Sequence, residues 1–432
     1  MKIKFIGAIT DVTGSMTLLE TDQGKVLIDC GLYQGTEEVV KRNLLELPFK
    51  PKDISAIILT HAHLDHSGFI PRLIKLGFRG HIYATKATMK LALLIMSDSA
   101  RILEKNEHHL LHSFYTMENV AVATSLFKTK KYHASFDILD MTVSLFPAGH
   151  ILGASSVLIK TSDKTIVFSG DLGRQDDPLI FPPEDCPPAD IVIMESTYGG
   201  KKRTGDLHDE LSFFLKKIKK ESKVGIIASF AVARAQSLIT LIHKFYKEFP
   251  EEKIRLVIDG PMMTEANKIY KEFAHDIKLS EELKFALEEV EVIDHLGEWE
   301  SISKKDGPLL VITSSGMVTG GRIWRYLENW QHDENACLFL PGYQAIGTSG
   351  RSLSEGKRNI HDEKGKQIHW SGEVITSQAF SSHADQIELL SWIKNIKKET
   401  QIYLNHGERD SKAALKKVLN ELGYNNVIIA ES

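Results

Sequence analysis

The stretch His61-Ala62-His63-Leu64-Asp65-His66 places four potential metal ligands within six residues. It directly follows the apolar run at 54–60, whose pattern predicts a buried strand, so the four side chains stand at a strand's carboxyl end. In an extended segment residues i and i+2 face the same way, so His61 and His63 can bind one ion. Asp65 and His66, where the chain turns into the next helix, then face a second ion. The stretch therefore favours a centre with two metals.

The composition is that of an ordinary soluble globular protein of 432 residues, of which 42% are hydrophobic and 25% charged. This length predicts two or three domains. The apolar runs are too short to cross a bilayer and Met1–Phe5 lacks the hydrophobic region of a signal peptide, so we expect no membrane association and a cytoplasmic location. The net charge of −4 excludes a global basic field for unspecific nucleic-acid binding. Short basic runs at 128–131, 201–203 and 216–220 are best interpreted as solvated surface.

Three scattered cysteines, Cys30, Cys186 and Cys337, form no CxxC motif and cannot all pair. This fits a reducing compartment and leaves metal binding to histidine and carboxylate. Such ligands without sulfur favour zinc, with manganese or iron as the next choices. Separate structural zinc sites are the alternative, which the scarcity of cysteine disfavours.

Further histidines and carboxylates stand at the ends of apolar, strand-like runs, as the first four do. The runs end near residues 28, 59, 146, 168, 194, 376 and 405. In α/β proteins, chemistry collects at such strand ends. The complete set is Asp29, His61, His63, Asp65, His66, His150, Asp171, Glu195, His383 and His406. We expect these residues to converge on one site.

A long amphipathic helix is predicted from about 86 to 111, and it carries His108 and His109, with His112 just beyond. His108 and His112 are one helical turn apart, so a metal site is conceivable. They lack the context of a strand end that carries a carboxylate, and we therefore interpret all three as solvated helix histidines.

From about 199 to 370 helices and strands alternate, which predicts a separate α/β domain with a parallel sheet between helices. Two glycine-rich turns, at 314–322 and 347–351, precede helices and could bind phosphate, although any α/β turn can look like this. The candidate substrate-binding residues are Ser315, Arg322, Thr348 and Arg351 in these turns, and Ser381 and Ser382 beside His383.

The stretch at 61–66 resembles the HxHxDH signature of metallo-β-lactamase-fold hydrolases, and Asp29, His150 and Asp171 stand in the order of that superfamily's other motifs. Three later segments, 195–199, 381–385 and 406–408, resemble the further motifs of the β-CASP branch and surround the inserted domain. The resemblance covers essentially the whole chain. Within the branch it is greatest to the catalytic subunit of the cleavage-and-polyadenylation machinery and its compact bacterial and archaeal relatives, as the residues at 315–317 and 320–322 suggest.

This resemblance implies an α/β fold in which a metallo-β-lactamase αββα sandwich carries an inserted β-CASP domain. The sandwich would comprise residues 1–198 and 372–432, and the insert, a parallel sheet flanked by helices, residues 199–371.

The resemblance also implies a role for each residue of the expected site. His61, His63 and His150 would hold one zinc ion, Asp65, His66 and His406 the other, and Asp171 would bridge them. Asp29 would orient a histidine ligand. The two ions would share the hydroxide that attacks phosphorus. His383 would protonate the leaving oxygen with Glu195 keeping it charged, and Asp65 is counted with these two as catalytic. The products would carry a 5′-phosphate and a 3′-hydroxyl.

The sequence thus predicts a zinc-dependent ribonuclease of RNA processing or decay, acting as an endonuclease on single-stranded RNA. Additional 5′-exonuclease action, cleavage of DNA and a homodimer remain open. Because the chain shows neither the KH domains of archaeal relatives nor the carboxy-terminal domain of the RNase J group, we expect the cleft between the domains to determine RNA binding, and sequence-selective cleavage to need a partner.

Two other functions were weighed against the nuclease. A small-molecule metallohydrolase acting on thioesters or lactones is disfavoured by the large insert with its phosphate-binding turns. A non-catalytic RNA-processing scaffold is disfavoured because no expected metal ligand is missing.

Overall fold

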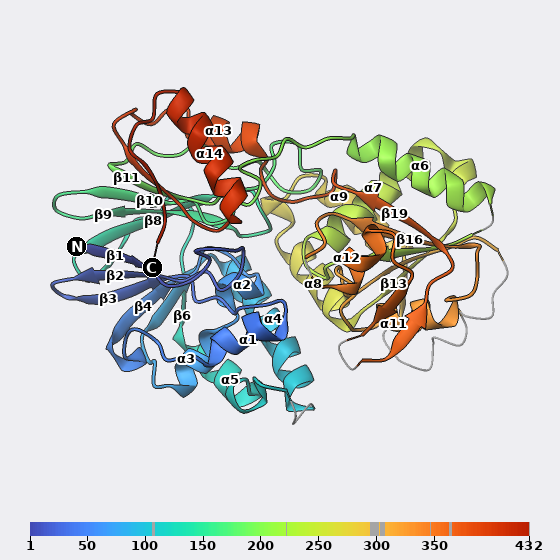
Figure 1. The fold of residues 1–432 in the computed structure, drawn as a ribbon, viewed down its shortest axis with the longest axis horizontal. Helices are drawn as coiled ribbons and strands as arrows, with labels where there is room; N and C mark the ends of the chain where they lie inside the picture. Colours follow the sequence, from blue (N-terminus) through green and yellow to red (C-terminus); the bar gives the residue numbers. More distant parts are fainter. Residues whose placement is uncertain are drawn as a thin grey trace. The chain divides into compact units, whose positions relative to one another are not determined.

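The computed structural model describes residues 1–105, 109–221, 223–293, 302, 307–345, 347–362 and 365–431. The chain forms two compact units (Figure 1). The first comprises residues 1–202 and 382–432, and the second comprises residues 203–381. The two segments of the first unit are therefore far apart in the sequence.

The first unit contains two sheets that face each other. Strands β1 to β3 of the first sheet are antiparallel and β3 to β6 are parallel. In spatial order they are β1 (Lys2–Phe5), β2 (Thr17–Thr21), β3 (Gly24–Ile28), β4 (Ile54–Ile58), β5 (His81–Ala84) and β6 (Phe127–Thr129). The first three strands thus form an antiparallel meander.

The second sheet combines strands from both segments of the first unit. Its first four strands are parallel and the others antiparallel. In spatial order they are β21 (Val427–Ile429), β20 (Gln401–Leu404), β11 (Ile191–Met194), β10 (Thr165–Phe168), β9 (Ser155–Lys160), β8 (Met141–Pro147) and β7 (Phe136–Ile138). The end of the chain thus completes a sheet begun before the second unit.

One hydrophobic core fills the space between these two sheets. Alternate residues of each strand contribute to it, such as Val26 and Ile28 from β3 and Val143 and Leu145 from β8. This period of two is what a sheet with one face on a core requires. Helices lie on the outer sides of both sheets (Figure 1). The αββα sandwich is therefore confirmed.

The helices of this unit differ in length, and the shortest lie in the connections. They are α1 (Glu37–Lys41), α2 (Leu64–Ser67), α3 (Ile70–Lys75), α4 (Lys86–Glu104), α5 (Met117–Leu126), α13 (Gln386–Trp392) and α14 (Arg409–Glu421), with 3₁₀ turns at Arg42–Leu44, Pro51–Asp53 and His112–Phe114. No helix among the described residues is both long and apolar enough to span a membrane.

The second unit has a parallel sheet of six strands, as predicted. In spatial order they are β14 (Glu291–Ile293), β13 (Arg255–Asp259), β15 (Leu309–Thr313), β12 (Val224–Ala228), β16 (Ala336–Pro341) and β19 (Glu373–Ser377). Adjacent residues of one strand enter different cores, since Ile226 belongs to one cluster and Ile227 to another. Both faces of the sheet are therefore buried, as all-parallel sheets require.

Helices supply the other half of these two cores. They are α6 (Leu207–Lys220), α7 (Arg234–Glu248), α8 (Pro261–Glu272), α9 (Ser280–Glu289), α11 (Ile323–Asn329) and α12 (Ser349–Ser354), with 3₁₀ turns at Pro250–Glu252 and Ala274–Asp276 and a hairpin of β17 (Asn359–His361) and β18 (Gln367–His369). Asp206 caps α6 by accepting hydrogen bonds from the backbone N–H groups of His208 and Asp209.

The helix predicted to reach residue 111 is shorter in the structure. α4 ends at Glu104, and the Nδ1 atom of His112 lies 2.7 Å from the carbonyl oxygen of Leu103, in the last turn of α4. This contact gives a second partner to that carbonyl oxygen, which also accepts a hydrogen bond from the N–H of Lys105. His108 lies outside the described residues. Among the described residues His109 and His112 belong to no group that could hold a metal.

The limits of the two units differ from the predicted domain boundaries at 198/199 and 371/372. The first unit reaches residue 202 and resumes at Ser382. The main difference is β19, which pairs with β16 in the sheet of the second unit. A short apolar run predicts a strand without saying which sheet the strand joins, because that pairing is a tertiary contact.

Candidate metal centre

The stretch at 61–66 begins just beyond β4, whose five residues are all buried except Ser55. His63 is extended, with φ −57° and ψ 151°, and immediately precedes the short helix α2. The hydroxyl of Ser67 donates hydrogen bonds to the carbonyl oxygens of Ala62 and His63, at 2.8 and 3.0 Å. The chain therefore turns between His63 and Asp65, which separates the ligands into two pairs as the sequence predicts.

The backbone of this turn packs closely against residues 15 and 30–31. The N–H of Ser15 donates to the carbonyl oxygen of Asp65, at 2.7 Å, and the N–H of Cys30 donates to that of His66, also at 2.7 Å. A Cβ atom on Gly31 would lie 1.7 Å from the same Asp65 oxygen. Only glycine fits there without a shift of the ligand-bearing turn.

We expect Gly31→Ala to destabilise the protein by about 1–3 kcal/mol, the usual cost of forcing extra volume into a packed region. Thermal unfolding checks this. The control is Gly260→Ala, because a Cβ atom there would meet its nearest neighbour at 3.6 Å, an ordinary contact. An equal and small change in both variants would contradict the close approach at Gly31.

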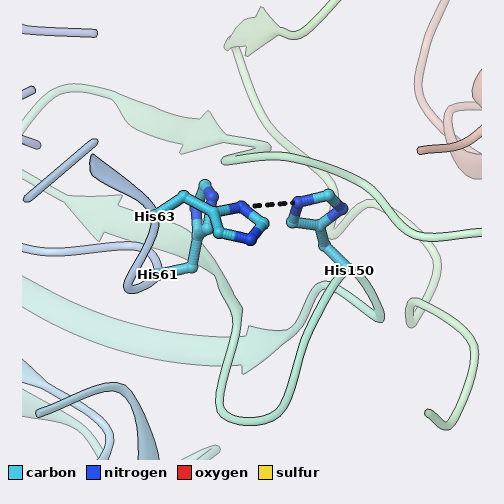
Figure 2. Close-up of side chains that lie close together, drawn as sticks. All are labelled: His61, His63 and His150. Atoms are coloured by element: carbon cyan, nitrogen blue, oxygen red, sulfur yellow. Dashed lines mark hydrogen bonds between the residues drawn. The ribbon is translucent and has the colours of Figure 1, made fainter. Parts of the chain in front are cut away.

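The first group that could hold a metal consists of His61, His63 and His150, whose possible ligand atoms lie within 4.8 Å of one another. Figure 2 shows one nitrogen of the His63 ring pointing toward one of the His150 ring, with 3.1 Å between His63 Nδ1 and His150 Nε2. Burial lowers the pKa of all three imidazoles, that of His63 to about 4. All three are therefore neutral at pH 7, the state in which histidine binds metals.

The second group consists of Asp65, His66, Asp171 and His406. His66 Nε2 lies 3.1 Å from His406 Nε2 and 3.2 Å from Asp171 Oδ1, and His406 Nε2 lies 3.5 Å from Asp65 Oδ2. Burial raises the pKa of the Asp65 carboxyl, but the hydrogen bond with His406 and the charge of His66 outweigh it and lower that pKa. Asp65 is thus an anionic oxygen donor.

Asp171 lies between the two groups. Its Oδ2 atom is 3.7 Å from His61 Nε2 and 3.9 Å from His150 Nε2, whereas its Oδ1 atom faces His66 and His406, at 3.2 and 3.5 Å. Burial would raise the pKa of this carboxyl, but the charges of the surrounding histidines hold it well below its usual range. One ionised carboxylate thus presents one oxygen to each group.

These residues fit a pair of divalent ions. Buried polar atoms usually have a hydrogen-bond partner, yet His61 Nε2, His150 Nδ1 and Asp171 Oδ1 have none. Leaving such atoms without a partner costs about 1–3 kcal/mol each, which binding of an ion at His61 Nε2 and Asp171 Oδ1 would recover. The donor set, imidazole and carboxylate without sulfur, suits zinc, manganese or iron.

Asp29 orients one histidine of the second group. It accepts hydrogen bonds from the N–H and hydroxyl of Thr60, at 2.8 and 3.0 Å, and contacts His66 Nδ1 at 2.7 Å. This contact turns the Nε2 atom of His66 toward Asp171, as a carboxylate beside a metal-binding histidine does. Burial lowers the pKa of His66, but Asp171 and Asp29 outweigh it and raise that pKa well above its ordinary value.

His383 lies beside the first group and pairs with Glu195. Its Nδ1 atom is 3.4 Å from Glu195 Oε1, and its ring centroid is 4.5 Å from that of His150. The side chain of His383 is 24% exposed, whereas that of Glu195 is 1% exposed. Burial lowers the pKa of His383, but Glu195 outweighs it and the pKa is raised. His383 therefore combines solvent access with a tendency to hold a proton.

The position of His383 is not set by a strand end, unlike the prediction, since β19 belongs to the second unit. Instead its backbone forms a bridge with Gly173, and the N–H of Ala384 donates to the carbonyl oxygen of Leu172, at 2.8 Å. Asp385 then starts α13 with a capping box that includes Glu388. Leu172 and Gly173, which directly follow Asp171, thus fix the backbone at His383.

Three parts of the chain match known domain families. Residues 9–210 match the metallo-beta-lactamase superfamily, residues 235–353 the Beta-Casp domain, and residues 367–430 the Zn-dependent metallo-hydrolase RNA specificity domain. A Thermus thermophilus protein, Ribonuclease TTHA0252, is 32% identical over 429 residues, covering 97% of this chain and 96% of the relative. The chain belongs to the β-CASP branch of the metallo-β-lactamase superfamily.

Further comparisons show how widely the similarity extends. The Probable RNase MJ4 of Methanocaldococcus jannaschii is 31% identical, covering 99% of this chain and 98% of the relative. The Cleavage and polyadenylation specificity factor 73 of Drosophila melanogaster is 26% identical, covering 97% of this chain and 61% of the relative. A solved structure of a protein from Enterococcus faecalis V583 has a TM-score of 0.59 at 16% identity, covering 99% of this chain and 97% of that chain.

The predicted substrate-binding residues of the β-CASP domain have partners within the domain. Arg322 pairs with the buried Asp259 and donates to the carbonyl oxygen of Ile293, at 3.0 Å. Arg351 Nε lies 2.6 Å from Glu355 Oε1. Thr348 caps α12, and Ser315 accepts a hydrogen bond from the N–H of Thr319. These contacts give Arg322 and Thr348 structural roles within the β-CASP domain. Contact of the four residues with a substrate stays a prediction.

Ser381 and Ser382 differ from these four because they precede His383 in the chain. Ser381 is 5% exposed and its N–H lies 3.4 Å from the carbonyl oxygen of Gln378, whereas Ser382 is partly exposed. Their contact with a substrate stays a prediction.

Two residues that the sequence did not single out also belong to the metal centre. Thr60 links Asp29 to His61, since its hydroxyl lies 3.1 Å from His61 Nδ1 as well as bonding to Asp29. Thr197 Oγ1 lies 3.3 Å from His406 Nδ1. Both threonines follow a strand within two or three residues and lie next to predicted site residues in the sequence. This position is the feature by which the sequence could have indicated them. Threonine is so common at strand ends that it carries little information by itself.

Proposed function

We propose that this protein is a metal-dependent ribonuclease that hydrolyses phosphodiester bonds of single-stranded RNA. The observation that carries the proposal is the placement of Asp171, one of whose oxygens faces each group of candidate ligands while the loop behind it holds His383. The names of the relatives, a ribonuclease and a probable RNase, support RNA as the substrate.

The two groups would each hold one divalent ion, with Asp171 shared between them and zinc as the favoured metal. When bound, the ions would supply an activated water at neutral pH and neutralise the charge that develops on the phosphate. Asp29 would keep the His66 ring in the orientation that binds metal, because it contacts the opposite ring nitrogen.

His383 would donate a proton to the oxygen that leaves. Glu195 contacts Nδ1, so the proton would come from Nε2 of the imidazolium. Glu195 itself is oriented by the N–H of Leu172, which donates to Oε1 at 2.8 Å, and by that of Thr197, which donates to Oε2 at 3.1 Å. These donors fix the carboxylate and hence the imidazole. The family resemblance implies that the 3′ oxygen leaves, and its protonation would give products with a 5′-phosphate and a 3′-hydroxyl.

The test uses purified protein with 5′-labelled linear RNA and with circular RNA, each with and without chelator. We expect cleavage of both substrates, loss of cleavage with the chelator and recovery when zinc or manganese is added back. Metal analysis of the same sample should find two ions per chain. Cleavage of the linear RNA alone would instead indicate 5′-exonuclease action. If the metal-loaded protein cleaves neither RNA but rapidly hydrolyses a thioester, the ribonuclease proposal is wrong.

Three narrower predictions stay untested: a cytoplasmic location, cleavage of DNA and a homodimer. Cys30, Cys186 and Cys337 are all buried and form no disulfide, in keeping with the reducing compartment inferred from the sequence. Cleavage of a DNA oligonucleotide of the same sequence and the mass of the protein in solution would decide the other two.

A further inference from the structure

Phe230 stands at a special position of the β-CASP sheet. It follows β12 by two residues, and β12 lies between β15 and β16. The next strand of this sheet along the chain after β12 is β13, which lies on the β15 side of β12. The next strand after β16 is β19, which lies on the opposite side. The carboxyl ends of β12 and β16 therefore form a topological switch point, where open α/β sheets bind their ligands.

The side chain of Phe230 is 40% exposed, although a buried position would be more favourable for an aromatic ring. Its neighbour Ser229 is fully buried, and the Ser229 N–H donates to the carbonyl oxygen of Thr313, at 2.9 Å. The carbonyl oxygen of Phe230 accepts a hydrogen bond from the N–H of Ala235, in the first turn of α7, at 3.2 Å. The backbone on both sides of the ring is thus fixed while the ring reaches solvent.

A glycine and an arginine lie close to the ring. A Cβ atom on Gly316 would lie 3.0 Å from Phe230 Cδ2 and 2.9 Å from the Phe230 backbone nitrogen, so only glycine allows this approach. The guanidinium carbon of Arg234 lies 5.8 Å from the ring centroid, and this guanidinium also bonds to the carbonyl oxygen of Pro341. The loops after β12, β15 and β16 together hold the ring in one orientation.

We propose that Phe230 is a stacking platform for one unpaired base of the bound RNA. A partly exposed aromatic ring on a fixed backbone can stack on any base, because every base has a π face. The adjacent guanidinium adds favourable electrostatics for a polyanion. The inference rests on the proposed ribonuclease function and adds to it a contact with a base, separate from the chemistry at phosphorus.

The test measures binding and hydrolysis separately. Binding of a fluorescent single-stranded RNA oligonucleotide is followed by anisotropy for the wild type, Phe230→Leu and Phe230→Trp, each in a His383→Ala background that preserves the RNA. Hydrolysis of bis(p-nitrophenyl) phosphate, which offers no base to stack, is followed with His383 intact. Phe213→Leu is the matched control, since Phe213 is 63% exposed on α6, away from the strand ends.

We expect Phe230→Leu to raise the Kd for RNA roughly tenfold, the size of one base–aromatic stack. Phe230→Trp and Phe213→Leu should keep the wild-type Kd within about twofold, and all variants should hydrolyse the small phosphodiester alike. A scan with oligonucleotides that lack one base at successive positions sharpens the test. One position should weaken binding to the Phe230-containing protein and have no effect on binding to Phe230→Leu.

The outcomes separate this inference from the proposed function. If the protein with His383 intact hydrolyses RNA but Phe230→Leu binds RNA as tightly as the Phe230-containing protein, the stacking platform is wrong and the ribonuclease stands. If the protein cleaves no RNA, the ribonuclease proposal fails first. If thermal unfolding shows that Phe230→Leu does not fold, Phe230→Trp and the base-deletion scan on the Phe230-containing protein decide. The proposal is then wrong if no single missing base weakens RNA binding.

Discussion

Asp171→Asn is expected to bind much less metal than the wild type and to hydrolyse RNA about 10³-fold more slowly, since the charge contributed at a metal centre is worth several kcal/mol. The carboxylate offers a separate oxygen to each group of histidines, so the amide removes an anionic donor from both at once. The Asn side chain also places an NH₂ group near His66 or His61. This group has no lone pair to offer at a position where a metal ion needs an oxygen ligand. Metal content per chain, measured after dialysis, is the first readout.

The matched control for Asp171 is Asp190→Asn. Asp190 is exposed and accepts a hydrogen bond from the N–H of Thr165, at the opposite end of the strand that leads to Asp171. The control should keep both its metal and its activity. If Asp171→Asn kept two ions per chain after dialysis, as the wild type should, Asp171 would not be shared between two metals.

Much of the site follows from the sequence because parallel strands end at a common edge. Asp29 follows β3 and His61 follows β4 in one sheet, and Asp171, Glu195 and His406 follow β10, β11 and β20 in the other. These strands are neighbours within each sheet. Polar residues that follow neighbouring parallel strands lie at the same edge of the sheet. This rule was sufficient to group these five residues.

The parts that could not be predicted depend on contacts between distant residues. Arg322 pairs with Asp259, 63 residues earlier in the chain, and no local sequence pattern indicates this partner. β19 carries a clear strand pattern, but its pairing with β16 places it in the second unit. Residues 117–138 hold α5, β6 and β7, which were not predicted, because these elements are short and their apolar residues follow neither period strongly. The local hydrophobic pattern thus predicts a helix or strand but not which distant residues it contacts.

His383→Ala is expected to keep the metal content of the wild type and to lose about 10²–10⁴-fold in RNA hydrolysis, the usual contribution of a general acid. The structure leaves a competing role open, because His383 also forms a possible metal-binding group with His150 and Asp171. Metal content separates the two roles. A proton donor can be removed without loss of metal, whereas a ligand cannot.

His406→Ala is the contrasting variant, since His406 belongs to the second group and lies 3.1 Å from His66 through their Nε2 atoms. It should lose metal together with activity. The matched control is His133→Ala, because His133 and Glu184 form an exposed pair at 3.2 Å in the same unit and should affect neither readout.

Glu195→Gln completes the series. Glutamine keeps the shape of Glu195 but not the charge that raises the pKa of His383, so we expect full metal content and a smaller loss of activity than in His383→Ala. In the double variant the loss should equal that of His383→Ala alone, because Glu195 acts through the imidazole. Independent, additive losses would show that Glu195 has a role of its own, and metal loss in His383→Ala would make His383 a ligand instead of a proton donor.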